Sequence, residues 1–64
     1  MLRYRLKFYD NYHKDYRIAS EDSLYELLMY WGFWMDIAEE WYIHRIDDDD
    51  RIVLIGRSAK EAKQ

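Results

Sequence analysis

The side chains of this sequence that could take part in chemistry are two histidines, three serines and a group of carboxylates. His13 and His44 lie far apart in the sequence, and neither belongs to a helical H-x-x-x-H pair. Because the chain has no cysteine, two separated histidines make a poor zinc site. Ser20 and Ser23 are explained as helix caps, and Ser58 lacks the context of a nucleophile. We therefore expect no metal site and no nucleophilic catalysis.

The carboxylates do not form a catalytic pattern either. Glu39 and Glu40 are adjacent, so in a strand they point to opposite faces and are not a paired acid and base. The aspartates at 47–50 lack the glycine and the distal glutamate of a calcium-binding EF-hand loop. No glycine-rich loop exists to hold a phosphate. The sequence predicts a protein that is not an enzyme and uses no cofactor.

The length and composition of the chain limit the kind of domain that can hold these residues. The chain of 64 residues forms one domain at most, and its core must be small. Cysteine is absent, but three Trp, seven Tyr and two Phe can bury much apolar surface. No run of about 18 uncharged apolar residues is present, and basic residues interrupt the apolar start. We expect neither a membrane span nor a signal peptide, and a cytoplasmic location.

The first third of the chain predicts a hairpin of two strands. Residues 2–9 alternate between apolar and mainly basic side chains, which is the period of a half-buried strand. Turn-forming residues at 10–11 separate them from a second strand at 12–19. In that strand we expect Tyr16 and Ile18 to face inward. The side chains that we expect to face outward are His13, Asp15 and Arg17.

The middle of the chain predicts one amphipathic helix. Its apolar stripe at i, i+3, i+4 and i+7 consists of Leu24, Leu27, Leu28 and Trp31. Ser20 is a suitable N-cap, and Ser23 followed by Glu26 is a second possible capping box. We expect the helix to end near Gly32, with a loop or a short helical turn over residues 34–39.

The last third predicts two more strands, at 40–46 and 51–57, joined by the aspartates of the turn. The fourth strand is apolar on both faces, as expected for a central strand, and residues 58–64 form a polar tail. The fold class is therefore α+β: a single domain at 1–57 with β-β-α-β-β order and a four-stranded, mostly antiparallel sheet. One helix packs on one face, and the first and last strands pair in the middle. In element order this resembles the β-grasp-like arrangement of small immunoglobulin-binding bacterial domains.

Charge is segregated along the chain, and this directs the functional hypothesis. Residues 1–19 carry a net charge of +3, residues 20–50 carry −9 and residues 51–64 carry +3. One short helix covers only part of the aromatic side chains, and exposed Trp and Tyr are typical of protein interfaces. We expect a protein-binding module of the inhibitor or adaptor type, such as phages or mobile elements encode, that binds a basic protein surface. The expected contact residues are Tyr30, Trp34, Asp36, Glu39, Glu40, Trp41, Tyr42, Asp47, Asp48, Asp49 and Asp50.

Two alternatives use the sheet. Basic and aromatic side chains on one sheet face can bind single-stranded nucleic acid, although the acidic middle segment would repel phosphates. The residues of that face are Arg3, Arg5, Lys7, Tyr9 and Arg17. A homodimer through the open sheet face is the other alternative. With Ile52 and Leu54 inward, the face would expose Val53 and Ile55 beside Tyr42 and Ile46.

Overall fold

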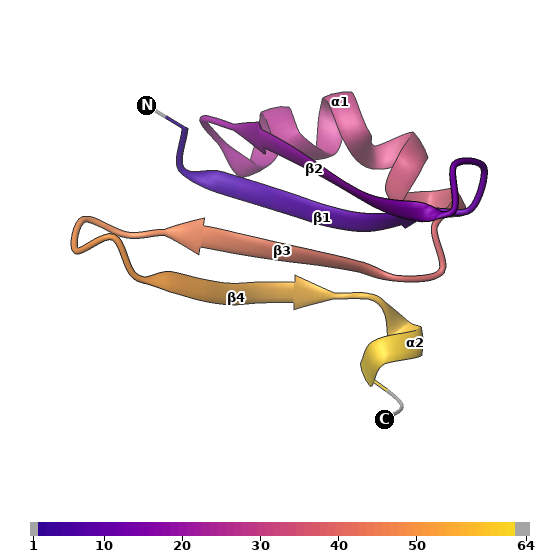
Figure 1. Cartoon of the computed structure of the whole chain (residues 1–64). Helices are drawn as coiled ribbons and strands as arrows, with labels where there is room; N and C mark the ends of the chain where they lie inside the picture. Colours follow the sequence, from indigo (N-terminus) through magenta and orange to yellow (C-terminus); the bar gives the residue numbers. More distant parts are fainter. Residues whose placement is uncertain (1, 63–64) are drawn as a thin grey trace.

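The computed structural model describes residues 2–62, with side chains to residue 60. The chain folds as β-β-α-β-β, followed by one further turn of helix (Figure 1). The elements are β1 (Tyr4–Asp10), β2 (Asp15–Glu21), α1 (Leu24–Ile37), β3 (Trp41–Ile46), β4 (Ile52–Arg57) and α2 (Ala59–Ala62). The predicted α+β class and element order are confirmed.

The strand order is β2-β1-β3-β4, and all three neighbouring pairs are antiparallel. The predicted pairing of the first and last strands is therefore wrong, and so is the central place given to β4. The crossover through α1 carries the chain past β1, so β3 pairs with the free side of β1. The short turn after β3 then returns the chain as a hairpin, which leaves β4 at the sheet edge.

The β1–β2 turn is held by the carboxylate of Asp10. This carboxylate accepts the backbone N–H groups of Tyr12 and His13 at 2.9 and 3.2 Å, and it contacts His13 Nδ1 at 2.6 Å. Lys14 has a φ of 57° and donates its N–H to the carbonyl of Asp10 at 2.7 Å. The loop therefore spans residues 11–14, and β2 begins at Asp15 rather than at residue 12.

This turn sets which side chains of β2 face the helix. Leu6 of β1, which is fully buried beneath α1, pairs with Ala19. Arg17 lies two residues away from Ala19 and so shares the helix side, whereas Tyr16 and Ile18 lie on the open face. The predicted inward placement of Tyr16 and Ile18 is wrong, because a one-residue change of register turns every side chain to the other face.

The helix α1 begins at the second of the two predicted caps. The Ser23 hydroxyl accepts the backbone N–H of Glu26 at 3.1 Å, whereas Ser20 belongs to β2. The helix passes through Gly32, so the predicted break there is wrong. A glycine inside a helix costs only about 1 kcal/mol, and the longer helix allows Met35 to pack into the core.

Only part of the predicted apolar stripe of α1 is buried. Leu27 is fully enclosed and Trp31 is half-buried, but Leu24 and Leu28 are 37% and 46% exposed. The core consists of Leu6, Phe8, Leu27, Met35 and Ile43. The helix contacts β1 and β2, while β3 and β4 extend beyond it (Figure 1). A helix about 10 Å wide covers roughly two strands spaced about 4.8 Å apart, so half of the sheet stays without a helix.

A β-bulge alters the faces of β4. Ile43 pairs with Gly56 but His44 pairs with Leu54, so Ile55 is an extra residue. Ile52 and Leu54 therefore lie on the open face, and Val53 lies on the helix side. The sequence left the register of β4 open, and the structure does not have the arrangement with Ile52 and Leu54 inward on which the open-face dimer depends.

The first residues of the predicted polar tail pack against the domain. Ser58 is buried, and its N–H donates to the carbonyl of Trp41 at 2.9 Å. The short helix α2 follows, and residues 63–64 lie outside the described part of the chain. Within residues 2–62 no helix is long and apolar enough to cross a membrane.

Candidate binding groove

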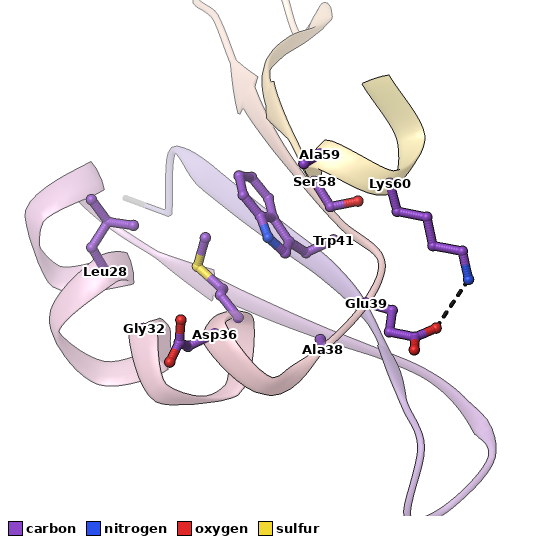
Figure 2. Close-up of a pocket in the computed structure, with 10 residues that line it drawn as sticks. Leu28, Gly32, Asp36, Ala38, Glu39, Trp41, Ser58, Ala59 and Lys60 are labelled. Carbon is purple, nitrogen blue, oxygen red and sulfur yellow. Dashed lines mark hydrogen bonds and ion pairs between the residues drawn. The ribbon is translucent and has the colours of Figure 1, made fainter. Parts of the chain in front are cut away.

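A groove of about 450 Å³ lies between α1 and the half of the sheet that has no helix over it (Figure 2). One wall comes from Leu28, Gly32, Met35 and Asp36 of α1, and the other comes from Trp41 of β3 and residues 58–60. The groove exists because α1 covers only the β1–β2 half, so the side of α1 that faces β3 is open.

The floor of the groove is apolar. The indole of Trp41 is half-buried and lies between α1 and α2 (Figure 2). A Cβ atom at Gly56 would lie 3.4 Å from the Trp41 ring, so the glycine lets this ring lie close across β4. Met35 is buried beside it and Leu28 is half exposed. These side chains provide an apolar contact surface for a partner.

Gly32 widens the groove in the middle of α1. Apart from its chain neighbours and the nearby helix backbone, a Cβ atom built at this position would meet no atom of the described residues within 4 Å. No contact within the described residues therefore requires a glycine here, although glycine weakens a helix by about 1 kcal/mol relative to alanine. The missing side chain lowers the wall of the groove and lets another chain approach the backbone of α1 closely.

The rim of the groove carries opposite charges at one end. Lys60 Nζ donates to Glu39 Oε2 at 3.0 Å, as the dashed line in Figure 2 marks. The Glu39 carboxylate raises the pKa of Lys60 above its ordinary value. Asp36 is exposed on α1 and has no ionic partner among the described side chains. The free charge of this rim is therefore negative.

Three of the predicted contact residues, Asp36, Glu39 and Trp41, meet in this groove. Tyr30 is exposed elsewhere on α1, and Trp34 is half-buried against Phe8, with ring centroids 6.3 Å apart.

Two more lie toward the open face of the sheet. Tyr42 pairs with Lys7 on that face, and Glu40 accepts the Tyr16 hydroxyl at 3.1 Å. This hydrogen bond to Glu40 raises the pKa of Tyr16.

The aspartates at 47–50 lie at the far end of β3 from Glu39. A strand of six residues separates the two acidic groups, which corresponds to about 20 Å. Asp47 closes the β3–β4 turn by accepting the backbone N–H groups of Arg51 and Asp49, both at 2.9 Å. The N–H of Arg51 is the main cause that lowers the pKa of Asp47. The predicted acidic residues thus form two separate groups.

The sequence pattern left Tyr25 and Met29 uncovered, but it did not predict the exposed ridge that they form with Phe33 and Ile37 on the outward side of α1. Tyr25, Met29, Phe33 and Ile37 follow one another at a spacing of four and are 74%, 53%, 70% and 55% exposed. The spacing itself was the available signal, because residues four apart lie on the same side of a helix. The helix is therefore apolar on both sides, and the sheet covers only one.

The basic residues that were predicted for nucleic acid are divided between the two sheet faces. Arg5, Lys7 and Tyr9 lie on the open face, where the Lys7 ammonium is 4.7 Å from the centre of the Tyr16 ring. Arg3 precedes β1 and is exposed. In contrast, Arg17 lies on the helix side, where its guanidinium is 3.6 Å from Asp10 Oδ2 and 5.9 Å from the centre of the Trp34 ring.

Within residues 2–60 no three histidine, aspartate or glutamate side chains come together as a metal site requires. No protein-family model, no curated protein and no solved structure matches this chain.

Proposed function

We propose that this protein is a non-enzymatic protein-binding module whose groove accepts an amphipathic helix of a partner protein. One observation carries the proposal: a groove with an apolar floor and a charged rim lies beside α1, over the half of the sheet that no helix of residues 2–62 covers. A partner helix placed there completes the layer that α1 begins. Such helix-in-groove binding is a recurring mode of protein recognition.

Gly32 supports a helix as the occupant. Packed helices have their axes about 8–10 Å apart, and the closest distances need small residues at the contact. Gly32 is such a residue, and the space in front of it is empty. The partner helix would cross α1 at this point, with its apolar stripe on Leu28 and Trp41.

The charge of α1 specifies the rest of the partner. The helix contains Glu26 and Asp36 but no basic residue. We expect the partner helix to carry lysine or arginine next to its apolar stripe, opposite Asp36. The protein then acts as an inhibitor or adaptor, and the cytoplasmic location remains a prediction.

The test is capture with the tagged full chain from the cells that produce it. Gly32→Leu places a side chain in the groove from a position with open space in front of it, and we expect it to abolish capture of the specific partner. Asp36→Lys reverses the charge of the rim, and Asp48→Lys is its matched control at the far end of β3. The proposal would be refuted if both Gly32→Leu and Asp36→Lys captured the partner as well as the parent chain does.

The open face of the sheet favours a second function, the binding of single-stranded nucleic acid. Arg5 and Lys7 lie there among Tyr9, Tyr16 and Tyr42, and basic groups between tyrosines suit phosphate contact and base stacking. Fluorescence anisotropy with an oligothymidylate at low salt tests it. Binding that weakens with salt and is lost in Lys7→Glu, but kept in Arg45→Glu on the helix side, would favour this function.

A further inference from the structure

The outer edge of β4 has the properties of a strand that pairs with another chain. No strand within residues 2–62 pairs with this edge. From Ile52 to Gly56 the strand carries no charged side chain. The exposed fractions of the four apolar residues are 57%, 43%, 48% and 38% for Ile52, Ile55, Leu54 and Val53. An exposed, uncharged and apolar edge strand is a template for further pairing.

The opposite edge of the same sheet is protected. The strand β2 carries Asp15, Arg17 and Glu21 along its length, and its turn adds Lys14. Charged side chains on an edge strand disfavour pairing with a second chain. The two edges therefore differ in kind, and β4 is the edge that is open to association.

The bulge gives β4 a symmetric pattern of faces. Ile52 and Arg57 pair with residues of β3 that are four apart, so both lie on the open face. Val53 and Gly56 pair with residues of β3 that are two apart, so both lie on the helix side. In a regular strand of the same six residues, without the bulge, spacings of five and three would put each of these two pairs on opposite faces.

This symmetry makes β4 complementary to itself. An antiparallel second copy, related by a two-fold axis between Leu54 and Ile55, would place Ile52 opposite Arg57 of that copy. Val53 would lie opposite the second copy's Gly56. In both pairs the side chains share a face of the extended sheet, as directly opposed residues must. Such a contact, with the same patch used by both subunits, is the usual form of a dimer interface.

Charge complements this arrangement at both ends of the contact. Antiparallel pairing brings Arg57, at the end of β4, beside the turn that precedes β4 in the second copy. That turn exposes Asp48, Asp49 and Asp50, which have no ionic partner among the described side chains. Because of the two-fold symmetry, the contact between the basic end of one β4 strand and the acidic turn of the other copy occurs twice in each dimer.

We infer that the protein forms a two-fold homodimer in which the β4 strands pair antiparallel and the two sheets join into one of eight strands. This inference does not depend on the proposed function of the groove. The test distinguishes this dimer from two other outcomes. These are the pairing of β4 with a strand of another protein and a dimer through the open sheet face.

Sedimentation velocity of the full chain over a range of concentrations is the first measurement. We expect a shift toward twice the mass of the 8.1 kDa chain as concentration rises. Ile52→Lys places a cation opposite Arg57 of the second copy and should raise the dimer dissociation constant roughly tenfold or more. Ile18→Lys is the matched control, because it makes the same change on the same face at the β2 edge. Circular dichroism establishes that both variants are folded.

A charge exchange tests the register. Arg57→Glu alone and Asp49→Lys alone should each weaken the dimer, whereas the double variant restores opposite charges and should recover it. A chain that stays monomeric at all concentrations would overturn the inference. So would a dimer that Ile18→Lys disrupts as strongly as Ile52→Lys does, which would assign the contact to the open face. Failure of the double variant to recover the dimer would overturn the proposed pairing.

Discussion

The two halves of the sheet differ in how they are covered. In the β1–β2 half, α1 lies over the strands, and Leu6 and Phe8 are at most 1% exposed. Over β4 no helix of residues 2–62 lies above the strand, and each residue of β4 from Ile52 to Ile55 is at least 38% exposed. Only Ile43 of the β3–β4 half is buried in the core. A single helix is too narrow for four strands, so the core forms under α1 from β1 and from Ile43 of β3. The apolar side chains of β4 stay exposed and provide contact surface.

The same division applies to the charges that surround the strands. The β2 edge carries charged residues and is suited to water, whereas the β4 edge is apolar and ends at Arg57. The groove, the bulge and the β4 edge all belong to the uncovered half. A partner helix in the groove and a second copy at the edge would each bury apolar surface that a lone chain leaves in water.

The largest expected effect compares one leucine from each half. Leu27 is fully buried under the covered half, and Leu54 is 48% exposed in the uncovered half. We expect Leu27→Ala to reduce the free energy of unfolding by about 2–5 kcal/mol through lost burial and cavity formation. Leu54→Ala should cost less than about 1 kcal/mol, because its side chain is already half in water. Urea unfolding of dilute protein measures both.

The size of the domain makes this difference visible. At about 0.05–0.15 kcal/mol per residue, a chain of this length has only about 3–10 kcal/mol of stability in total. Leu27→Ala should therefore leave much of the protein unfolded near body temperature. Equal losses in the two variants would show that β4 contributes to the core as much as the part of the domain under α1 does.

The elements could be predicted from the sequence, but their pairing could not. The alternation of side chains predicted β1. Of the two N-caps predicted for α1, Ser23, which Glu26 follows three residues later, is the one observed. Four consecutive apolar residues in β4 indicated a central strand, since burial on both faces gives the same pattern. An edge strand that pairs with another chain can have the same run of apolar residues, so the sequence alone does not distinguish it from a central strand.

The site was predictable only in part. Asp36 and Trp41 were named from exposure and composition, and both line the groove. The groove itself depends on α1 continuing through Gly32, where the sequence pattern indicated an end. Local glycine chemistry favoured the break, and the burial of Met35 in the core outweighed it. The ridge that includes Phe33 was missed because the predicted stripe used only one side of the helix.

A smaller effect compares the two hairpin turns, each closed by an aspartate. The hydrogen bond from the His13 ring is the main cause that lowers the pKa of Asp10, and the backbone N–H of Arg51 does the same for Asp47. A carboxyl with a lowered pKa binds fewer protons in the folded state. Its contribution to stability is therefore present above about pH 4 and is lost as the pH falls through the folded pKa.

Asp10→Asn and Asp47→Asn should each make the loss of stability below about pH 4 less steep. We expect the larger change for Asp10, because its side chain is 4% exposed against 16% for Asp47. Urea unfolding at several acid pH values measures the slopes. If Asp47→Asn gave the larger change, the β3–β4 hairpin would be the more tightly held turn, against the division of the domain described above.

The smallest expected effect is a gain in stability at the wall of the groove. Gly32→Ala should raise the free energy of unfolding by about 0.5–1 kcal/mol, because alanine loses less backbone entropy in a helix. Nothing lies within 4 Å of the added Cβ atom, so no clash offsets the gain. Gly56→Ala is the control, since its Cβ atom would lie 3.4 Å from the Trp41 ring and has no comparable free space.

Thermal unfolding of the two variants compares their stabilities. A loss of stability in Gly32→Ala would mean that the chain itself occupies the groove. A gain would mean that the glycine weakens the lone domain, which supports a partner as the reason for the open space at this position.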